Sequence, residues 1–479
     1  MLDEEIIVKD AKNGSERLLI WNVVLMCLLP AVLFGGNSDL ATGIFIALGI
    51  LAPLNVVNYR RIWIDAPPST IPLYTLTLLP FAAAVLISAC GLFNGALISS
   101  ESGTKGFFKL VTNDPSAIVS AADSAIAALS PDLVALAAAA CAFSMFFITE
   151  SKYILRRIFF FCAAGAAILA LFGFFYNAIG MIPKFILPSF GNDAFSTFTD
   201  SSQWAAFAII WIGGAMTIAA YSAQRYRLLT FSYSLKFFSL LIAAILLFSV
   251  LDVGTPLERA VGLSLMGAGC ALLFADTFPT KRNLARHWTS RYVHSKYKKL
   301  KLSLAPAVYL CISAACFFSA AATAAGSWRN PNERLIVNEI SADKITLAER
   351  VNIYDDSREL ISMRPAFGWG SGSFANVFSF RQGADLGPTP FRSPQSDLLQ
   401  KIVENGYVGL GISLCAPLAF LIFWITRRKL SKAGSMLFLT SGALALVAVF
   451  DNPLQSIAVL QSFWIILVGA FKWDTCNNR

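Results

Sequence analysis

Long apolar stretches recur along the whole chain and constrain its fold more than any other feature. A helix of about 18 or more apolar residues is long enough to cross a hydrocarbon core roughly 30 Å thick. Only 14% of the residues are charged, which is too few to cover the surfaces of several soluble domains. The sequence therefore predicts an all-α integral membrane protein, a polytopic bundle of about 12 transmembrane helices.

The apolar stretches also give approximate positions for the spans. We predict spans at 18–36, 40–58, 72–97, 130–149, 158–180, 204–222, 229–251, 260–278, 304–326, 406–425, 435–451 and 455–471. The expected domains are a transmembrane domain over 1–326, a large helical extracytoplasmic loop over 327–405 that catalyses or binds, and a transmembrane domain with a short cytoplasmic tail over 406–479.

Two segments between spans carry further patterns. Segment 98–130 has an amphipathic pattern from Pro115 to Leu129, which predicts a segment that lies in the membrane interface. Segment 327–405 is the longest polar stretch, and loops of such length are usually functional. Its run from Ile345 to Met363 has the pattern of a helix.

Positive charge is unevenly distributed between the predicted loops. With the N-terminus inside, every inside loop carries Lys or Arg, whereas the short outside loops carry only Lys184 and Arg259. The positive-inside rule therefore predicts cytoplasmic N- and C-termini. The dense basic stretch over 281–301 is expected to face anionic membrane lipids, so the net charge of +9 does not require nucleic acid. This orientation places both histidines, His287 and His294, inside.

Ionisable residues are nearly absent from the middle of the predicted spans. Ion-coupled transporters place such residues there. The main exception here is Lys236, which is close enough to the inner end of its span to snorkel. No cluster of His and Cys indicates a metal ion or a disulfide framework. The pattern favours an enzyme acting on a membrane-embedded substrate, with a flippase or other multi-span transporter as the alternative and a receptor or scaffold third.

The long loop carries several motifs in a fixed order. Residues 350–374 read RVNIYDDSRELISMRPAFGWGSGSF, an Arg-led helix followed by Pro, a Gly-aromatic-Gly turn and a Gly-x-Phe. Further along, Gln395-Ser396 is followed after nine residues by Gly406 and then by Gly409.

Two shorter motifs come earlier, at the predicted outer ends of spans. Residues 196–205 read STFTDSSQWA, and residues 258–260 read ERA. Together the motifs resemble those of the bacterial O-antigen ligase and O-antigen polymerase family. That family shows His-Asn or His-Ser where this chain has Gln395-Ser396, and it shares the large loop between the ninth and tenth spans.

The resemblance implies a membrane glycosyltransferase of the bacterial inner membrane. Such enzymes move a glycan from undecaprenyl pyrophosphate to an acceptor hydroxyl on the periplasmic face, without a metal or another cofactor. The acceptor is lipid A-core for a ligase and a second lipid-linked repeat unit for a polymerase, and one sequence does not separate these. Other polysaccharide-assembly proteins are further expected partners.

The departing lipid pyrophosphate develops negative charge, which arginine binds well because its fork contacts two oxygens. Arg259 is the first candidate for this clamp, and its alternative is snorkelling to lipid phosphate. The resemblance adds Arg350, whose alternative is a structural ion pair, and the weaker candidates Arg364 and Arg392.

The acceptor hydroxyl needs a general base, and the histidine of the family is absent here. Gln395 stands in its place and could orient the acceptor, while Asp397 or Glu404 could take up the proton. The alternatives are a first-turn helix acid for Asp397 and an ordinary interfacial residue for Glu404. A changed activity or an inactive relative also fits the missing histidine.

Three more residues are predicted to contact the glycan. Trp369 could stack on a sugar ring or anchor the loop at the interface. Gly370 allows a tight turn and a close approach of ligand. Gln203 belongs to the motif that enters the sixth span.

Overall fold

The described chain is almost entirely helical. The computed structural model describes residues 2–62, 70–94, 97–100, 107–110, 117–179, 194–225, 230–277, 304–329, 347–379, 381–383, 386, 391, 393–426 and 431–476. The long helices are α1 (Leu2–Val32), α2 (Asp39–Ile62), α3 (Thr70–Leu92), α4 (Ala125–Ile148), α5 (Lys152–Ile179), α6 (Ser201–Arg225), α7 (Thr230–Val253), α8 (Pro256–Thr277), α10 (Leu304–Arg329), α11 (Leu347–Met363), α13 (Asp397–Thr426), α14 (Lys432–Phe450) and α15 (Ile457–Thr475). The short elements are η1 (Phe34–Gly36), α12 (Phe374–Phe378), η3 (Pro453–Gln455) and the strands β1 (Leu97–Ser100) and β2 (Phe107–Leu110).

Twelve of these helices, all of the long ones except α11, are long and apolar enough to cross a membrane. They coincide with the twelve predicted spans, so the prediction of an all-α polytopic bundle is confirmed. The strands add one small antiparallel hairpin outside the bundle. Helices dominate because a helix pairs its own backbone N–H and C=O groups, and an apolar bilayer offers those groups no hydrogen-bond partners.

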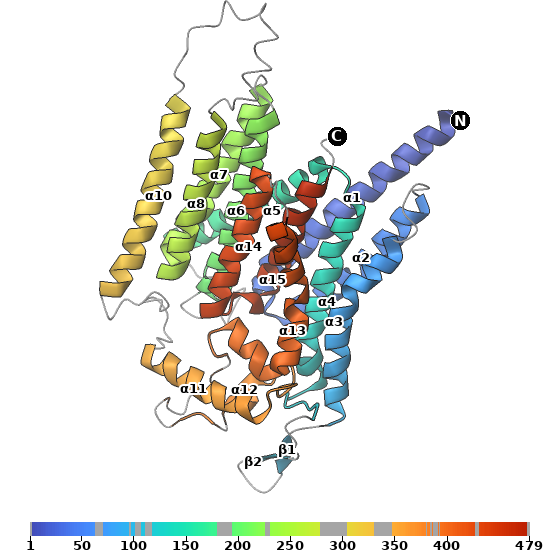
Figure 1. Cartoon of the computed structure of the whole chain (residues 1–479), viewed down its shortest axis with the longest axis vertical. Coiled ribbons are helices and arrows are strands. Elements are labelled where there is room, and N and C mark those ends of the chain that lie inside the picture. The colour runs from blue at the N-terminus through green and yellow to red at the C-terminus, as the bar shows by residue number, and fades with distance from the viewer. Residues whose placement is uncertain are drawn as a thin grey trace, which may run out of the picture.

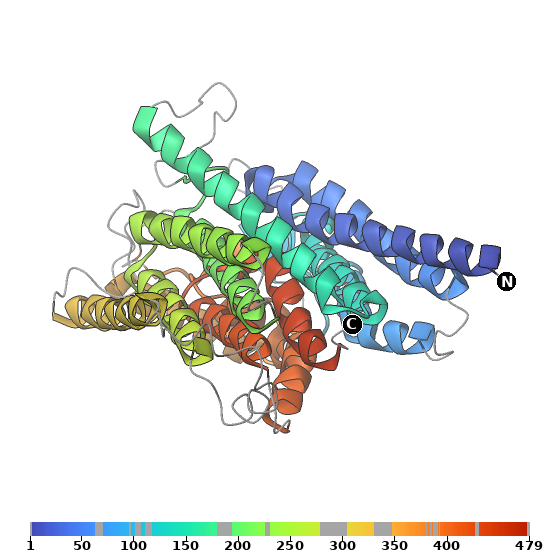
Figure 2. The same cartoon turned by 90° about the horizontal axis from the view of Figure 1, so that it is seen from above.

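Helix α6 lies at the centre of the bundle. Every residue of its membrane span is buried, and α5, α7, α8, α14 and α15 pack around it. Helices α7, α8 and α10 extend the bundle on one side, and α1 to α4 on the other, as Figures 1 and 2 show. Helix α10 packs mainly against α8 and exposes most of its surface.

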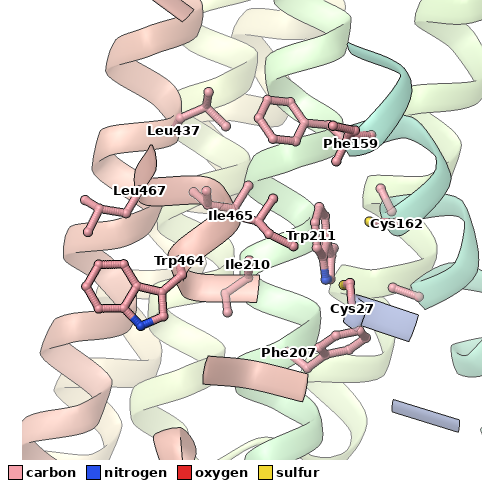
Figure 3. Packing of buried hydrophobic residues seen from close by; sticks show 14 of the residues in the cluster. Cys27, Phe159, Cys162, Phe207, Ile210, Trp211, Leu437, Trp464, Ile465 and Leu467 are labelled. Carbon is pink, nitrogen blue, oxygen red and sulfur yellow. The ribbon is translucent and has the colours of Figure 1, made fainter. Parts of the chain in front are cut away.

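Aromatic side chains fill the space around α6 (Figure 3). Trp211 is fully buried, and its indole N–H donates to the hydroxyl of Ser462 at 3.2 Å. The Ser462 hydroxyl in turn lies 2.7 Å from the carbonyl of Ala458 and 3.4 Å from the thiol of Cys27. A buried polar group without such partners would cost free energy in this setting, and these hydrogen bonds offset that cost for Trp211 and Ser462.

The crossing of α6 and α14 depends on a glycine. A Cβ atom at Gly213 would lie 1.9 Å from Oγ1 of Thr440, so the two helices approach as closely as small residues allow. We expect Gly213→Ala to lower the free energy of unfolding by about 1–3 kcal/mol, since the overlap forces a shift of the backbone. Thermal unfolding in detergent measures this.

Two further variants test the cause of the Gly213 effect. Adding Thr440→Ala to Gly213→Ala is expected to restore most of the lost stability, because it removes Oγ1 of Thr440, which the added Cβ would overlap. Gly442→Ala on α14, where a Cβ meets nothing within 4 Å, is the matched control and is expected to cost nothing. Equal losses at Gly213 and Gly442 would contradict the steric explanation.

A small module covers one end of the bundle. We call it the loop module, which comprises α11, the turn 364–373, α12 and residues 393–405. It has its own apolar core, formed by Val119, Ile353, Leu360, Trp369, Phe374, Phe378, Leu386 and Val403, among others. Both ends of the chain lie at the opposite end of the bundle (Figure 1). Helix α11 confirms the helical pattern predicted from Ile345 to Met363 within the residues described.

Segment 98–130 is described over 98–100, 107–110 and 117–130. Residues 117–124 contain no helix, and α4 begins at Ala125. The N–H of Ala121 donates to the carbonyl of Trp369 at 2.9 Å, so 117–121 adds an extended segment to the loop module. The basic stretch 281–301 and its histidines lie outside the described residues.

Helix α13 contains a break at Gly406, where φ is 64° and ψ is −172°. The turn 364–373 fills the break. The N–H groups of Trp369 and Gly370 donate to the carbonyls of Val403 and Glu404, at 3.0 and 2.7 Å. On the other side of the break, the N–H groups of residues 407 and 408 donate to the carbonyls of residues 365 and 366. The turn thus replaces the hydrogen bonds that the break removes from the helix.

Candidate functional site

Polar side chains gather where the loop module meets the bundle. The loop-module ends of α4, α6, α8 and α14 carry buried Asp132, Ser202, Glu258 and Asp451, in that order along the chain. Carboxylates are rarely buried unless they are paired or hydrogen-bonded. These positions are therefore the first place to look for a site.

Ser202, Glu258 and Asp451 form what we call the carboxylate cluster. The Ser202 hydroxyl lies 2.9 Å from Oε1 of Glu258 and 2.6 Å from Oδ2 of Asp451. All three side chains are buried, with the Glu258 side chain fully so. One hydroxyl thus joins carboxyl groups from two different helix ends.

Local sequence rules place these three residues. Thr255 caps α8, and its N–H and hydroxyl lie 2.8 and 3.1 Å from Oε2 of Glu258, which is a capping box with Pro256 at the first helical position. Asp451 ends α14 and accepts the N–H of Asn452 through Oδ1 at 2.8 Å. Ser202 lies in the first turn of α6.

Arg350 of α11 brings a positive charge to the carboxylate cluster. Its side chain is buried, and Nη1 donates to the carbonyl of Phe450 at 2.9 Å. Burial raises the pKa of Asp451, whereas the hydrogen bond from Ser202 and the nearby Arg350 guanidinium act to lower it. Within the described chain, Nε of Arg350 is buried without an acceptor.

Two residues at the start of α13, Asp397 and Gln395, also lie near the carboxylate cluster. The Asp397 carboxylate accepts the N–H of Leu454 at 2.8 Å, and its own N–H donates to the carbonyl of Asp451 at 3.1 Å. Gln395 has a left-handed backbone, with φ of 55°, and its carbonyl accepts the hydroxyl of Tyr354 at 3.4 Å. Such a conformation outside glycine costs free energy and is enriched at functional sites.

Arg259 follows Glu258 but points elsewhere. It is half-buried, and its Nη2 lies 3.4 Å from the carbonyl oxygen of Asp252. Among the described residues no carboxylate lies within 4.0 Å of its guanidinium, and its Nε is buried without an acceptor. Among the described residues its guanidinium thus makes one long hydrogen bond.

A second cluster surrounds Asp132, which accepts the Ser88 and Ser371 hydroxyls at 2.6 Å each. Nζ of Lys401 lies 3.1 Å from the other oxygen of this carboxylate, and Asn405 donates to Ser371. We call these residues the Asp132 cluster. It fastens the loop module to α3 and α4.

Glu404 is buried on the same short stretch of α13 that carries Lys401. Its carboxylate accepts Nε2 of Gln400 at 3.0 Å and the N–H of Phe374 at 3.4 Å. Its burial does not fit the alternative of an ordinary interfacial residue. The contacts join α13 to the start of α12 and leave Glu404 apart from the carboxylate cluster.

Three residues predicted to bind ligand instead build the loop module. Trp369 is buried, and its indole N–H donates to the carbonyl of Leu360, so it neither faces a sugar nor anchors the interface. The Arg364 guanidinium lies over the Trp369 ring and donates to the carbonyl of Ala117. A Cβ at Gly370 would lie 2.9 Å from the backbone of Ser120, so the glycine allows these two segments to pack closely.

Two predicted site residues remain, Gln203 and Arg392. Gln203 is buried in the second position after the start of α6, where its side-chain oxygen accepts Nδ2 of Asn37 at 2.8 Å. Arg392 lies outside the described residues. The structure thus brings Arg350, Gln395 and Asp397 together, and it holds Arg259 near Glu258 along α8.

Sequence reasoning missed Asp451, Glu258 and Asp132 as site residues. The signal was present, because each acid stands at the end of a different span and all three ends were predicted on the same side of the membrane. The structure joins Glu258 and Asp451 through the Ser202 hydroxyl and places Asp132 in the separate Asp132 cluster.

The fold and its clusters define a multi-pass α-helical membrane protein with buried polar groups at one end of the bundle. No protein-family model matches the chain, and no curated protein matches it.

Proposed function

We propose that the chain is a membrane glycosyltransferase of the bacterial inner membrane. It moves a glycan from undecaprenyl pyrophosphate to an acceptor hydroxyl, as an O-antigen ligase or an O-antigen or exopolysaccharide polymerase does. In this proposal the loop module faces the periplasm and both termini face the cytoplasm. Partners are the lipid-linked donor, an acceptor glycan or lipid A-core, membrane lipids and other polysaccharide-assembly proteins.

One observation carries the proposal. Arg259 and Arg350 each keep a buried Nε–H without an acceptor in the described chain, at the end of the bundle where acids also gather. A buried unpaired donor is costly, and the oxygens of a pyrophosphate are acceptors suited to an arginine fork. The carboxylate cluster supplies the proton acceptor that an attacking hydroxyl needs.

The arrangement also supports chemistry at one membrane face over passage of a solute. The buried carboxylates of Asp132, Glu258 and Asp451 stand at helix ends under the loop module. A transporter is expected to place such groups around a site near the middle of the membrane. A flippase remains the alternative that the experiment below separates.

Arg259→Ala tests the proposed pyrophosphate clamp. In a deletion strain complemented with the variant, we expect glycan transfer to fall about 100-fold, which is typical for loss of one preorganised donor to a charged transition state. The melting temperature in detergent is expected to change little, because Arg259 is half-buried and makes one long hydrogen bond. Gels that resolve glycan length and attachment measure the transfer.

Arg358→Ala is the matched control, since Arg358 is exposed and, among the described residues, forms only a 3.5 Å pair with Asp355. Wild-type transfer by Arg259→Ala at normal expression would rule out the clamp. Loss of all attachment with long carrier-linked chains indicates a ligase, and loss of long chains with attached single units indicates a polymerase. Carrier-linked glycan retained on the cytoplasmic leaflet would instead indicate a flippase.

The orientation has its own test. A topology reporter fused after Thr280 is expected to read as cytoplasmic, because the basic stretch that follows obeys the positive-inside rule. An extracytoplasmic reading would turn the loop module to the cytoplasm, where no such donor glycan is transferred, and the proposal would be abandoned.

A further inference from the structure

The carboxylate cluster contains one hydroxyl proton for two carboxyl groups. The Ser202 hydroxyl is within hydrogen-bond distance of both Glu258 and Asp451, yet it can donate to only one of them. The other carboxyl must carry a proton and donate it to the Ser202 oxygen, since an ionised one would face the lone pairs of that oxygen. The cluster therefore stores one extra proton.

The contacts place that proton on Glu258. Its Oε2 faces two donors from Thr255, as the unprotonated oxygen of a carboxylic acid does, which leaves Oε1 to carry the proton. The Glu258 side chain is fully buried, where an ionised carboxylate is most costly. The 2.9 Å contact from Oε1 to Ser202 fits a neutral pair.

Asp451 has the surroundings of the anion. Its 2.6 Å contact with Ser202 has the length of a hydroxyl donating to a charged oxygen. Its other oxygen accepts the N–H of Asn452, and the Arg350 guanidinium is close enough to favour its ionised form. Asp397, by contrast, accepts the N–H of Leu454, and no cation is placed beside it in the described chain.

We propose that Glu258 is protonated at neutral pH and donates through Ser202 to an ionised Asp451, and that this Asp451 carboxylate takes the proton of the acceptor hydroxyl. The second half rests on the proposed function. During transfer the acceptor O–H bond breaks and its proton goes to Asp451, while the acceptor oxygen bonds to the anomeric carbon. The bond from that carbon to the pyrophosphate oxygen breaks, and its electron pair leaves with the pyrophosphate. Asp451 later releases the proton to water, and Glu258 and Ser202 act as positioning residues.

The charged and titratable groups around Asp451 set the pH dependence. They are Arg350 and Tyr354 from α11, Asp397 from α13, Glu258 from α8, and Asp200, which accepts the N–H of Ser202 at the start of α6. A base works only when ionised, so activity falls as the pH drops through its pKa. Ser202→Ala removes a donor that lowers the pKa of Asp451. The acidic limb of the kcat/KM profile is therefore expected to move up by about one pH unit.

Infrared spectra of the full chain in lipid nanodiscs test the position of the proton without any assay of activity. At pH 7 we expect the wild type to show a carbonyl-stretch band of a protonated carboxylic acid that Glu258→Gln removes. Asp451→Asn is expected to keep that band. Loss of the band in Asp451→Asn, or its survival in Glu258→Gln, would overturn the assignment. Melting temperatures show that each variant is folded.

Transfer assays with carrier-linked glycan extracted from the deletion strain test the second half. We expect Asp451→Asn to lower turnover at least about 100-fold, as loss of a general base does. Glu258→Ala is expected to lose most activity, and Glu258→Gln to regain it to within about tenfold, because an amide can donate and accept as a protonated acid does. Turnover by Asp451→Asn above half of wild type would refute Asp451 as the base. If the wild type transfers no glycan, the proposed function fails, and the infrared result alone decides where the proton lies.

Discussion

Gly406→Ala is expected to destabilise the protein by about 3 kcal/mol or more, the upper range for a single strained backbone position. The φ of 64° and ψ of −172° at Gly406 fall in a region that only glycine adopts readily. A Cβ there would also lie 2.2 Å from the carbonyl oxygen of Ala366, in the turn that fills the break of α13. The substitution therefore strains the helix break and displaces the turn at once.

Thermal unfolding in detergent measures the effect of Gly406→Ala. The matched control is Gly411→Ala on the same helix, where a Cβ meets nothing within 4 Å. In a regular helix this control is expected to be neutral or to stabilise by about 0.5–1 kcal/mol. If both variants have the same melting temperature, the turn 364–373 does not depend on the glycine at 406, and the explanation by strain and displacement is wrong.

Lys401→Met is expected to cost about 3–5 kcal/mol, the range measured when one partner of a buried ion pair is removed. The Asp132 side chain is only 2% exposed, and without Nζ of Lys401 it would keep only hydroxyl donors. An unpaired carboxylate at that depth is unfavourable, so the loop module should detach from α4 more readily. Limited proteolysis of the loop module, together with thermal unfolding, reports this.

Two variants isolate the charge as the cause. Adding Asp132→Asn to Lys401→Met removes the stranded carboxylate and is expected to recover most of the stability. Arg358→Met breaks an exposed pair with Asp355 and is expected to cost less than about 0.5 kcal/mol. A double variant as unstable as Lys401→Met alone would show that the lysine stem, rather than its charge, holds the module.

The spans were predictable because apolar length is a local property of the sequence. Each predicted span overlaps a helix of the structure, and within the run predicted from Ile345 to Met363 the described residues, from Leu347, form α11. The position of residues 117–121 depends instead on distant parts of the chain. The N–H of Ala121 donates to the carbonyl of Trp369, and Arg364 donates to the carbonyl of Ala117, and no periodicity within the segment carries that information.

The site was predictable in part. Arg350, Gln395 and Asp397 were chosen by their order in the chain, and the structure gathers them near Asp451. Trp369 was predicted to stack on a sugar ring or to anchor the loop at the membrane interface, but it is buried in the core of the loop module. A sequence shows that a residue is aromatic and follows a turn, yet it does not show which way the ring faces.

The sequence by itself determined that the described chain has twelve helices long and apolar enough to cross a membrane and that its charges stand at their ends, because both follow from the cost of placing polar groups in lipid. Only the tertiary structure decided which span ends meet. Ser202 lies 56 residues from Glu258 and 249 from Asp451, and the packing of α6, α8 and α14 brings the three within hydrogen-bond distance. A hydrogen bond depends on positions in space to within a few tenths of an ångström, and only the packed bundle fixes those positions.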